Sequence, residues 1–174
     1  MWKRLTYHMC ASELQQASER FRASFLGGQS LDPQERLQEL ERTSKDGVNI
    51  LKVLTLSVRP EQDFGLLTHA NAEVGTLLSN AGSAEVESAL TPGKLPPIVV
   101  SEATQLRLRE AMNKIAHMDP RPDKSSFAVD CQRHEVVLTG EQRGSGPWVA
   151  VLDIPKLCDV IMALPDRDIE PPAE

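Results

Sequence analysis

The apolar residues of this chain change their spacing between its first half and its last third. Up to about residue 82 they recur mostly at intervals of three and four, as in Leu14, Ala17 and Phe21, which is the period of an amphipathic helix. In the last third they alternate, as in the segment around Val136 and Leu138, which is typical of strands. A helical half followed by a group of strands favours an α+β fold.

The sequence predicts two helices at the N-terminal end. The first covers 10–26, where one apolar stripe faces a single direction. The second covers 32–45 and has a clear start, because Asp32 is a good N-cap and proline suits the first helical position that follows it. We expect Asp46-Gly47 to end this second helix.

The next two segments are harder to assign. Segment 48–58 alternates in part as a strand would, but some of its apolar residues also fit a helix. Its β-branched content and the turn before it favour a strand. A helix is predicted over 61–80, behind Pro60, because apolar residues recur there at helical spacing. These elements complete a mainly helical N-terminal unit over 1–82.

Segment 83–97 is rich in proline, glycine and serine and is predicted to be a linker. An α+β unit is expected over 98–165, with a helix from Ser101 to about Met118, a three-stranded antiparallel meander and a short closing helix. The expected strands and closing helix are 127–129, 134–139, 148–154 and 155–164. The acidic, proline-containing tail 166–174 is expected to be disordered.

The net charge and the cysteines indicate which partners and which cellular compartment to expect. The formal net charge is −6, which disfavours nonspecific binding to the phosphate backbone of nucleic acids. The three cysteines Cys10, Cys131 and Cys158 are odd in number and widely spaced, so free thiols in a reducing, cytoplasmic compartment are expected. No stretch approaches the ~20 apolar residues of a membrane span, and no membrane association is predicted.

No motif in the chain predicts a catalytic, metal or cofactor site. Cys131 and His134 form a Cys-x-x-His step, but a second pair of zinc ligands is lacking. An enzyme with a dispersed site is an alternative. It would use Cys158 at the start of the closing helix, His134 on the sheet, and Asp130 or Asp153.

The leading hypothesis is a non-catalytic protein-interaction unit, such as a regulator, an adaptor or a small subunit of a complex. Several predicted helices are short or narrowly striped, and such helices often bury their apolar face against a partner. Trp148 is either a core anchor of the meander or an exposed interface aromatic. With Phe21 and Phe25 it is the candidate contact for a protein partner or a second copy.

Nucleic-acid binding is a further alternative, in which helices 10–26 and 32–45 form a helix-turn-helix. The connection between them is longer than the usual turn. The second helix also carries Glu35, Glu39 and Glu41, which phosphates would repel. A DNA partner is therefore expected less than a protein partner.

Overall fold

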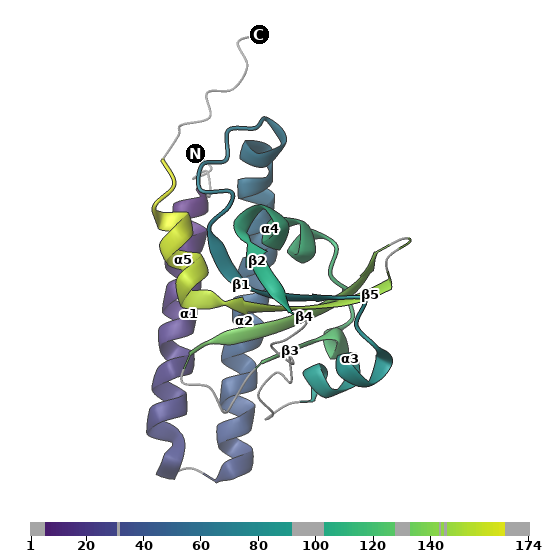
Figure 1. The fold of residues 1–174 in the computed structure, drawn as a ribbon. Helices are drawn as coiled ribbons and strands as arrows, with labels where there is room; N and C mark the ends of the chain where they lie inside the picture. Colours follow the sequence, from purple (N-terminus) through teal and green to yellow (C-terminus); the bar gives the residue numbers. More distant parts are fainter. Residues whose placement is uncertain are drawn as a thin grey trace.

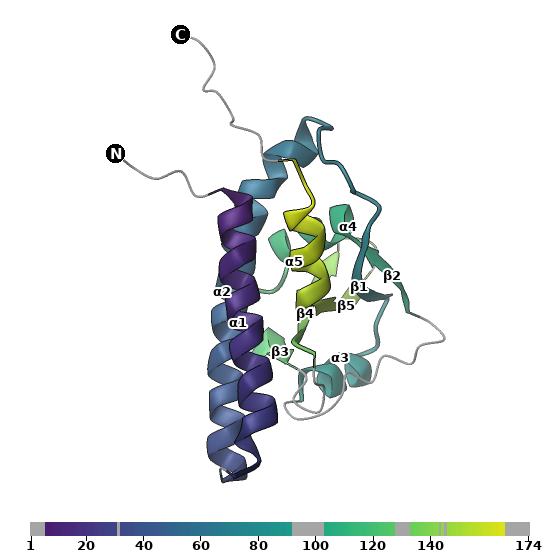
Figure 2. The ribbon, with the colours of Figure 1, turned by 90° about the vertical axis from the view of Figure 1, so that its left-hand side faces the viewer.

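The computed structural model describes residues 6–30, 32–91, 103–127, 133–142, 144 and 146–165. Its N-terminal part is a long helical hairpin of α1, Tyr7–Gly27, and α2, Pro33–Asp63, which lie antiparallel and side by side (Figures 1 and 2). The short 3-10 turn η1, Gly28–Ser30, follows α1. The predicted start of the second helix is confirmed, because the Asp32 carboxylate accepts a hydrogen bond from the Gln34 amide at 3.0 Å.

The strand predicted over 48–58 is wrong, because α2 continues through this segment. The buried residues of this segment recur at helical spacing. The helix is favoured over the strand because helical spacing places all of these residues on one face that packs in the core. They are Val48, Leu51, Leu54, Thr55 and Val58. Gly47 does not end the helix. A Cβ at this position would lie 3.2 Å from Cε1 of His134, so glycine permits the close approach of that ring.

The helix predicted over 61–80 is also wrong. Helix α2 ends at Asp63, and the chain turns through positive φ angles at Gly65 and His69. It then returns as β1, Glu73–Ser79. The register of β1 shifts between Glu73 and Gly75, so Val74 and Leu77 both reach the same core. This bulge gives the strand an apolar spacing that resembles a helix.

Within the described residues, five strands form one antiparallel sheet in the order β2-β1-β5-β4-β3. The predicted meander is confirmed as β3, Ser125–Phe127, β4, Glu135–Gln142, and β5, Gly146–Asp153. Residues 128 and 129 of the first predicted strand lie outside the described residues. The helix predicted from Ser101 to about Met118 is wrong at 104–107, where the chain forms β2, Thr104–Arg107, and pairs with β1. The rest of that prediction is confirmed as α4, Leu108–Ala116. The 3-10 turn η2, Pro122–Lys124, leads into β3. The predicted helix start at Ser101 and the tail 166–174 lie outside the described residues.

The segment predicted as a linker contains a helix, α3, Ser83–Leu90. Its start is stabilised by the Glu85 carboxylate, which accepts a hydrogen bond from the Gly82 amide at 2.6 Å. The preceding strand β1 pairs with β5 of the expected C-terminal unit. Both expected units therefore contribute to one sheet.

The sheet has a thick and a thin covering layer (Figure 1). The hairpin, α4 and the closing helix α5, Ile154–Met162, cover one face and enclose the main core. Helix α3 covers the other face, where Val86 and Ala89 pack against strand residues such as Val149. The closing helix is confirmed close to its predicted position, and the mixed architecture confirms the α+β class. No helix within the described part of the chain has the length and apolar composition needed to cross a bilayer.

Candidate functional site

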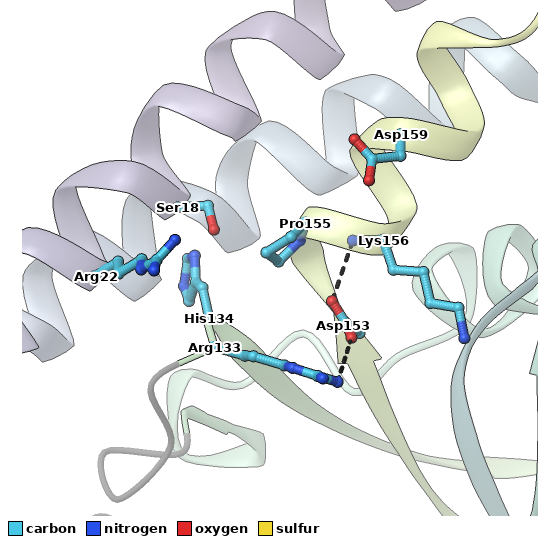
Figure 3. A pocket seen from close by; sticks show the side chains of 8 residues that line it. All are labelled: Ser18, Arg22, Arg133, His134, Asp153, Pro155, Lys156 and Asp159. Carbon is cyan, nitrogen blue, oxygen red and sulfur yellow. Dashed lines mark hydrogen bonds and ion pairs between the residues drawn. The ribbon is translucent and has the colours of Figure 1, made fainter.

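A pocket of about 730 Å³ lies where α1 meets the start of β4 and the N-terminal end of α5 (Figure 3). Its lining includes Ser18 from α1 and the buried ring of His134, which directly precedes β4. The elements are held in place by the backbone, because the amide of Ile154 donates to the carbonyl oxygen of His134 at 3.0 Å. The pocket therefore joins segments that are distant in the sequence.

The imidazole of His134 is the most unusual group in this pocket. It is 1% exposed and stacks on Phe21, with ring centroids 4.3 Å apart and planes at 13°. Both ring nitrogens lack a hydrogen-bond partner among the described residues. A buried polar group without a partner costs about 1–3 kcal/mol. Burial also lowers the pKa of His134 to about 4, so the ring is neutral near pH 7.

Charged side chains surround the opening of the pocket. Three cations, Arg22, Arg133 and Lys156, line it together with two carboxylates, Asp153 and Asp159. Two of the cations have partners. The Arg133 guanidinium lies 3.5 Å from the carboxylate of Asp153, and the Lys156 ammonium lies 2.8 Å from that of Glu73. Arg22 forms no ion pair with another described residue.

Asp153 also has a structural role at this site. Its carboxylate accepts a hydrogen bond from the backbone amide of Lys156 at 3.0 Å and so caps α5. The Asp153 carboxylate therefore has two partners, the Lys156 amide and the Arg133 guanidinium. Ser18, Arg22 and His134 form the corner of the pocket nearest α1, and no side chain of this corner has a hydrogen bond or ion pair with another described residue.

Cys158 lacks the exposure and the low thiol pKa that the enzyme hypothesis requires of a nucleophile. It is 1% exposed and packs in the main core. Burial, with a smaller effect from the carboxylates of Asp159 and Asp153, raises the pKa of its thiol to about 12. The thiol is therefore protonated near pH 7, and it is not among the residues that line the pocket with His134. Asp130 lies outside the described residues.

We expect Cys158 to react slowly with iodoacetamide at about pH 7.5, because only the thiolate is nucleophilic. The rate in the native protein should be at least about a hundredfold lower than in the denatured protein. Mass spectrometry of the modified peptides separates Cys158 from the other cysteines. A native rate close to the denatured rate would restore the enzyme hypothesis.

Comparison of the chain with protein-family models, curated proteins and solved structures found no match. Within the described residues, no group of three or more histidine, cysteine, aspartate or glutamate side chains could hold a metal ion. Cys131, the first residue of the Cys-x-x-His step, lies outside the described residues.

The three aromatic residues expected at a partner interface lie in different environments. Phe21 is fully buried, and Trp148 is 2% exposed with the Lys114 ammonium 4.8 Å from its ring centroid. Phe25 is half-buried, with the Arg36 guanidinium 4.9 Å from its ring. In this structure Phe21 and Trp148 contact their own chain. The core-anchor alternative for Trp148 agrees with its burial.

A different set of apolar side chains lies on the surface of α2 and just after it. Val53, Leu56, Phe64 and Leu66 are 40%, 74%, 79% and 45% exposed, and we call them the α2 apolar stripe. The spacing of Val53 and Leu56 places them on the side of the helix opposite the core residues Leu51 and Val58. This stripe could have been found only after 48–58 had been recognised as a helix.

Proposed function

We propose that the protein is a non-catalytic interaction unit that binds a protein partner, or a second copy of itself, through the α2 apolar stripe. The observation that supports this proposal is the exposure of Leu56 and Phe64. Single exposed apolar residues are common on protein surfaces. Here two exposed apolar residues, Val53 and Leu56, lie one turn apart on α2, and two more, Phe64 and Leu66, follow its end. Such a group is more typical of an interaction site.

The size of the apolar side chains supports the same proposal. Burying one leucine or phenylalanine side chain contributes roughly 1.5–3 kcal/mol. The stripe therefore offers several kcal/mol to a partner that covers it, before the entropy lost on association is subtracted. The nearby Arg59 and Asp63 lie 4.0 Å apart and would form a polar rim beside the apolar contact.

The other two functions have weaker support. The enzyme hypothesis requires a reactive Cys158, and that thiol is buried. DNA binding requires a recognition helix that is free to enter the major groove. Helix α2 instead packs along α1 (Figure 2). We also propose a reducing, cytoplasmic location, because the described cysteines Cys10 and Cys158 are unpaired.

The test is the double substitution Leu56→Asp and Phe64→Asp. Because both side chains are exposed, we expect the fold to persist, and the far-ultraviolet circular dichroism spectrum checks this. The wild-type protein should form a dimer or retain a co-purified partner in size-exclusion chromatography with light scattering. The variant should elute as a free monomer.

A matched control is Gln34→Asp with Gln38→Asp, which adds the same charge to exposed positions at the other end of α2. This control should assemble as the wild type does. A strictly monomeric wild-type protein without a co-purified partner contradicts the proposal. So does an equal loss of assembly in the control variant.

A further inference from the structure

We infer that the pocket beside His134 binds a small ligand through an oxyanion group, either a phosphate or a carboxylate. The oxyanion would lie in the corner nearest α1, beside Ser18, Arg22 and His134 (Figure 3). This site is separate from the α2 apolar stripe, and the inference does not depend on the proposed protein–protein contact.

The first support comes from the unused hydrogen-bonding groups of the corner. The His134 ring is 1% exposed, yet neither nitrogen has a partner among the described residues. Figure 3 shows the ring next to the end of the Arg22 side chain and on the same side of the pocket as Ser18. The Ser18 side chain is nearly buried and has no hydrogen bond within the described part of the chain. Buried polar groups are normally satisfied, so a group from outside the chain is expected here.

The second support comes from the charges. Arg22 has no ion pair with a described residue, whereas Arg133 and Lys156 already contact carboxylates. An arginine guanidinium matches the geometry of phosphate and carboxylate oxygens. The carboxylates that face the pocket, Asp153 and Asp159, lie on the α5 side (Figure 3). They would repel an anion there and so favour the corner near α1.

The neutral ring of His134 adds a preference between the two oxyanions. A neutral imidazole has one N–H donor and one acceptor nitrogen. A carboxylate can only accept hydrogen bonds, whereas hydrogen phosphate also carries an O–H group. Hydrogen phosphate can therefore pair with whichever nitrogen of His134 faces it, as donor or as acceptor, and we choose inorganic phosphate as the first probe.

The experiment is a titration of the full-length protein with inorganic phosphate at constant ionic strength. The Cε1–H resonance of His134 is followed by nuclear magnetic resonance, and the exposed His69 serves as an internal reference. We expect a saturable shift at His134 alone, with a dissociation constant of about 1 mM or lower. A parallel titration with acetate shows whether a carboxylate binds at the same corner.

Two arginine variants decide whether the binding is specific. Arg22→Gln should weaken binding at least about tenfold, because it removes the unpaired guanidinium. Arg20→Gln removes the same charge from an exposed position two residues away that does not line the pocket, and it should bind as the wild type does. Equal weakening in both variants overturns the inference, as does an unshifted His134 in both titrations. The double variant of the α2 apolar stripe should bind phosphate normally, which separates the two proposals.

Discussion

Replacing Trp148 with alanine is expected to lower the free energy of unfolding by about 3–5 kcal/mol. The Trp148 side chain is 2% exposed and belongs to the main core. Truncation removes its apolar contacts and leaves a cavity that the surrounding strands can fill only in part. It also removes the contact between the ring and the Lys114 ammonium.

The position opposite Trp148 shows how closely the ring is packed. Gly140 on β4 pairs directly with Trp148 on β5. A Cβ atom at Gly140 would overlap with the tryptophan ring and would crowd the carbonyl oxygen of His117. The ring therefore lies against the bare backbone of Gly140, and no smaller side chain at 148 would restore this contact.

Urea unfolding of the Trp148→Ala variant measures the effect, and Leu56→Ala is a suitable control. Leu56 is 74% exposed, so its truncation should change the stability by no more than about 0.5 kcal/mol. A loss of less than about 1 kcal/mol for Trp148→Ala would contradict a core role. It would instead favour a role of Trp148 in partner binding.

The stability of the protein should fall as the pH is lowered from about 6.5 to about 4, because of His134. Burial lowers the pKa of this residue from 6.5 to about 4. Between these values the unfolded chain binds a proton that the folded chain does not, so acid favours unfolding. At about 1.4 kcal/mol per pH unit, the loss amounts to about 3 kcal/mol. The contribution of His134 is complete at about pH 4 and does not grow below it.

Comparing the wild type with His134→Leu isolates this effect, because leucine is apolar, similar in volume and does not titrate. Urea unfolding is measured from about pH 7.5 to about pH 4.5 in a buffer without phosphate or carboxylate. The variant should show a shallower pH dependence than the wild type. Asp119, whose pKa Arg121 lowers to about 2, acts mainly below this range. Parallel profiles for the two proteins would contradict the prediction.

Local signals in the sequence were sufficient for some elements. Asp32 with the proline after it identified the start of α2, and the alternation around Val136 identified β4. Segment 48–58 fits both a strand and a helix by its sequence. It is a helix because one helical face is buried against the rest of the fold. Strand β1 was missed because its bulge spaces Val74 and Leu77 as a helix would. Propensity and periodicity do not include such long-range effects.

The candidate site was harder to predict from the sequence than the fold, because its residues come together only in the folded chain. The sequence singled out His134 but linked it to Cys158, whereas the structure stacks it on Phe21 of α1. Arg22 showed no distinguishing pattern, because only the packing of α1 beside α5 brings it to the pocket. Chemistry assembled from three separated elements leaves no spacing that a single sequence can reveal.

The two ends of the helical hairpin pack against cores of different size. The two halves of α2 are therefore expected to differ in local stability. At 31 residues, α2 is about 46 Å long, and its N-terminal half extends beyond the sheet with the end of α1 (Figures 1 and 2). That end is held by a small cluster centred on Phe21 and Leu40, whereas Leu51 and Val58 belong to the main core. We therefore expect amide hydrogens near the hairpin turn to exchange through a partial opening, and those near Leu51 to exchange only on global unfolding.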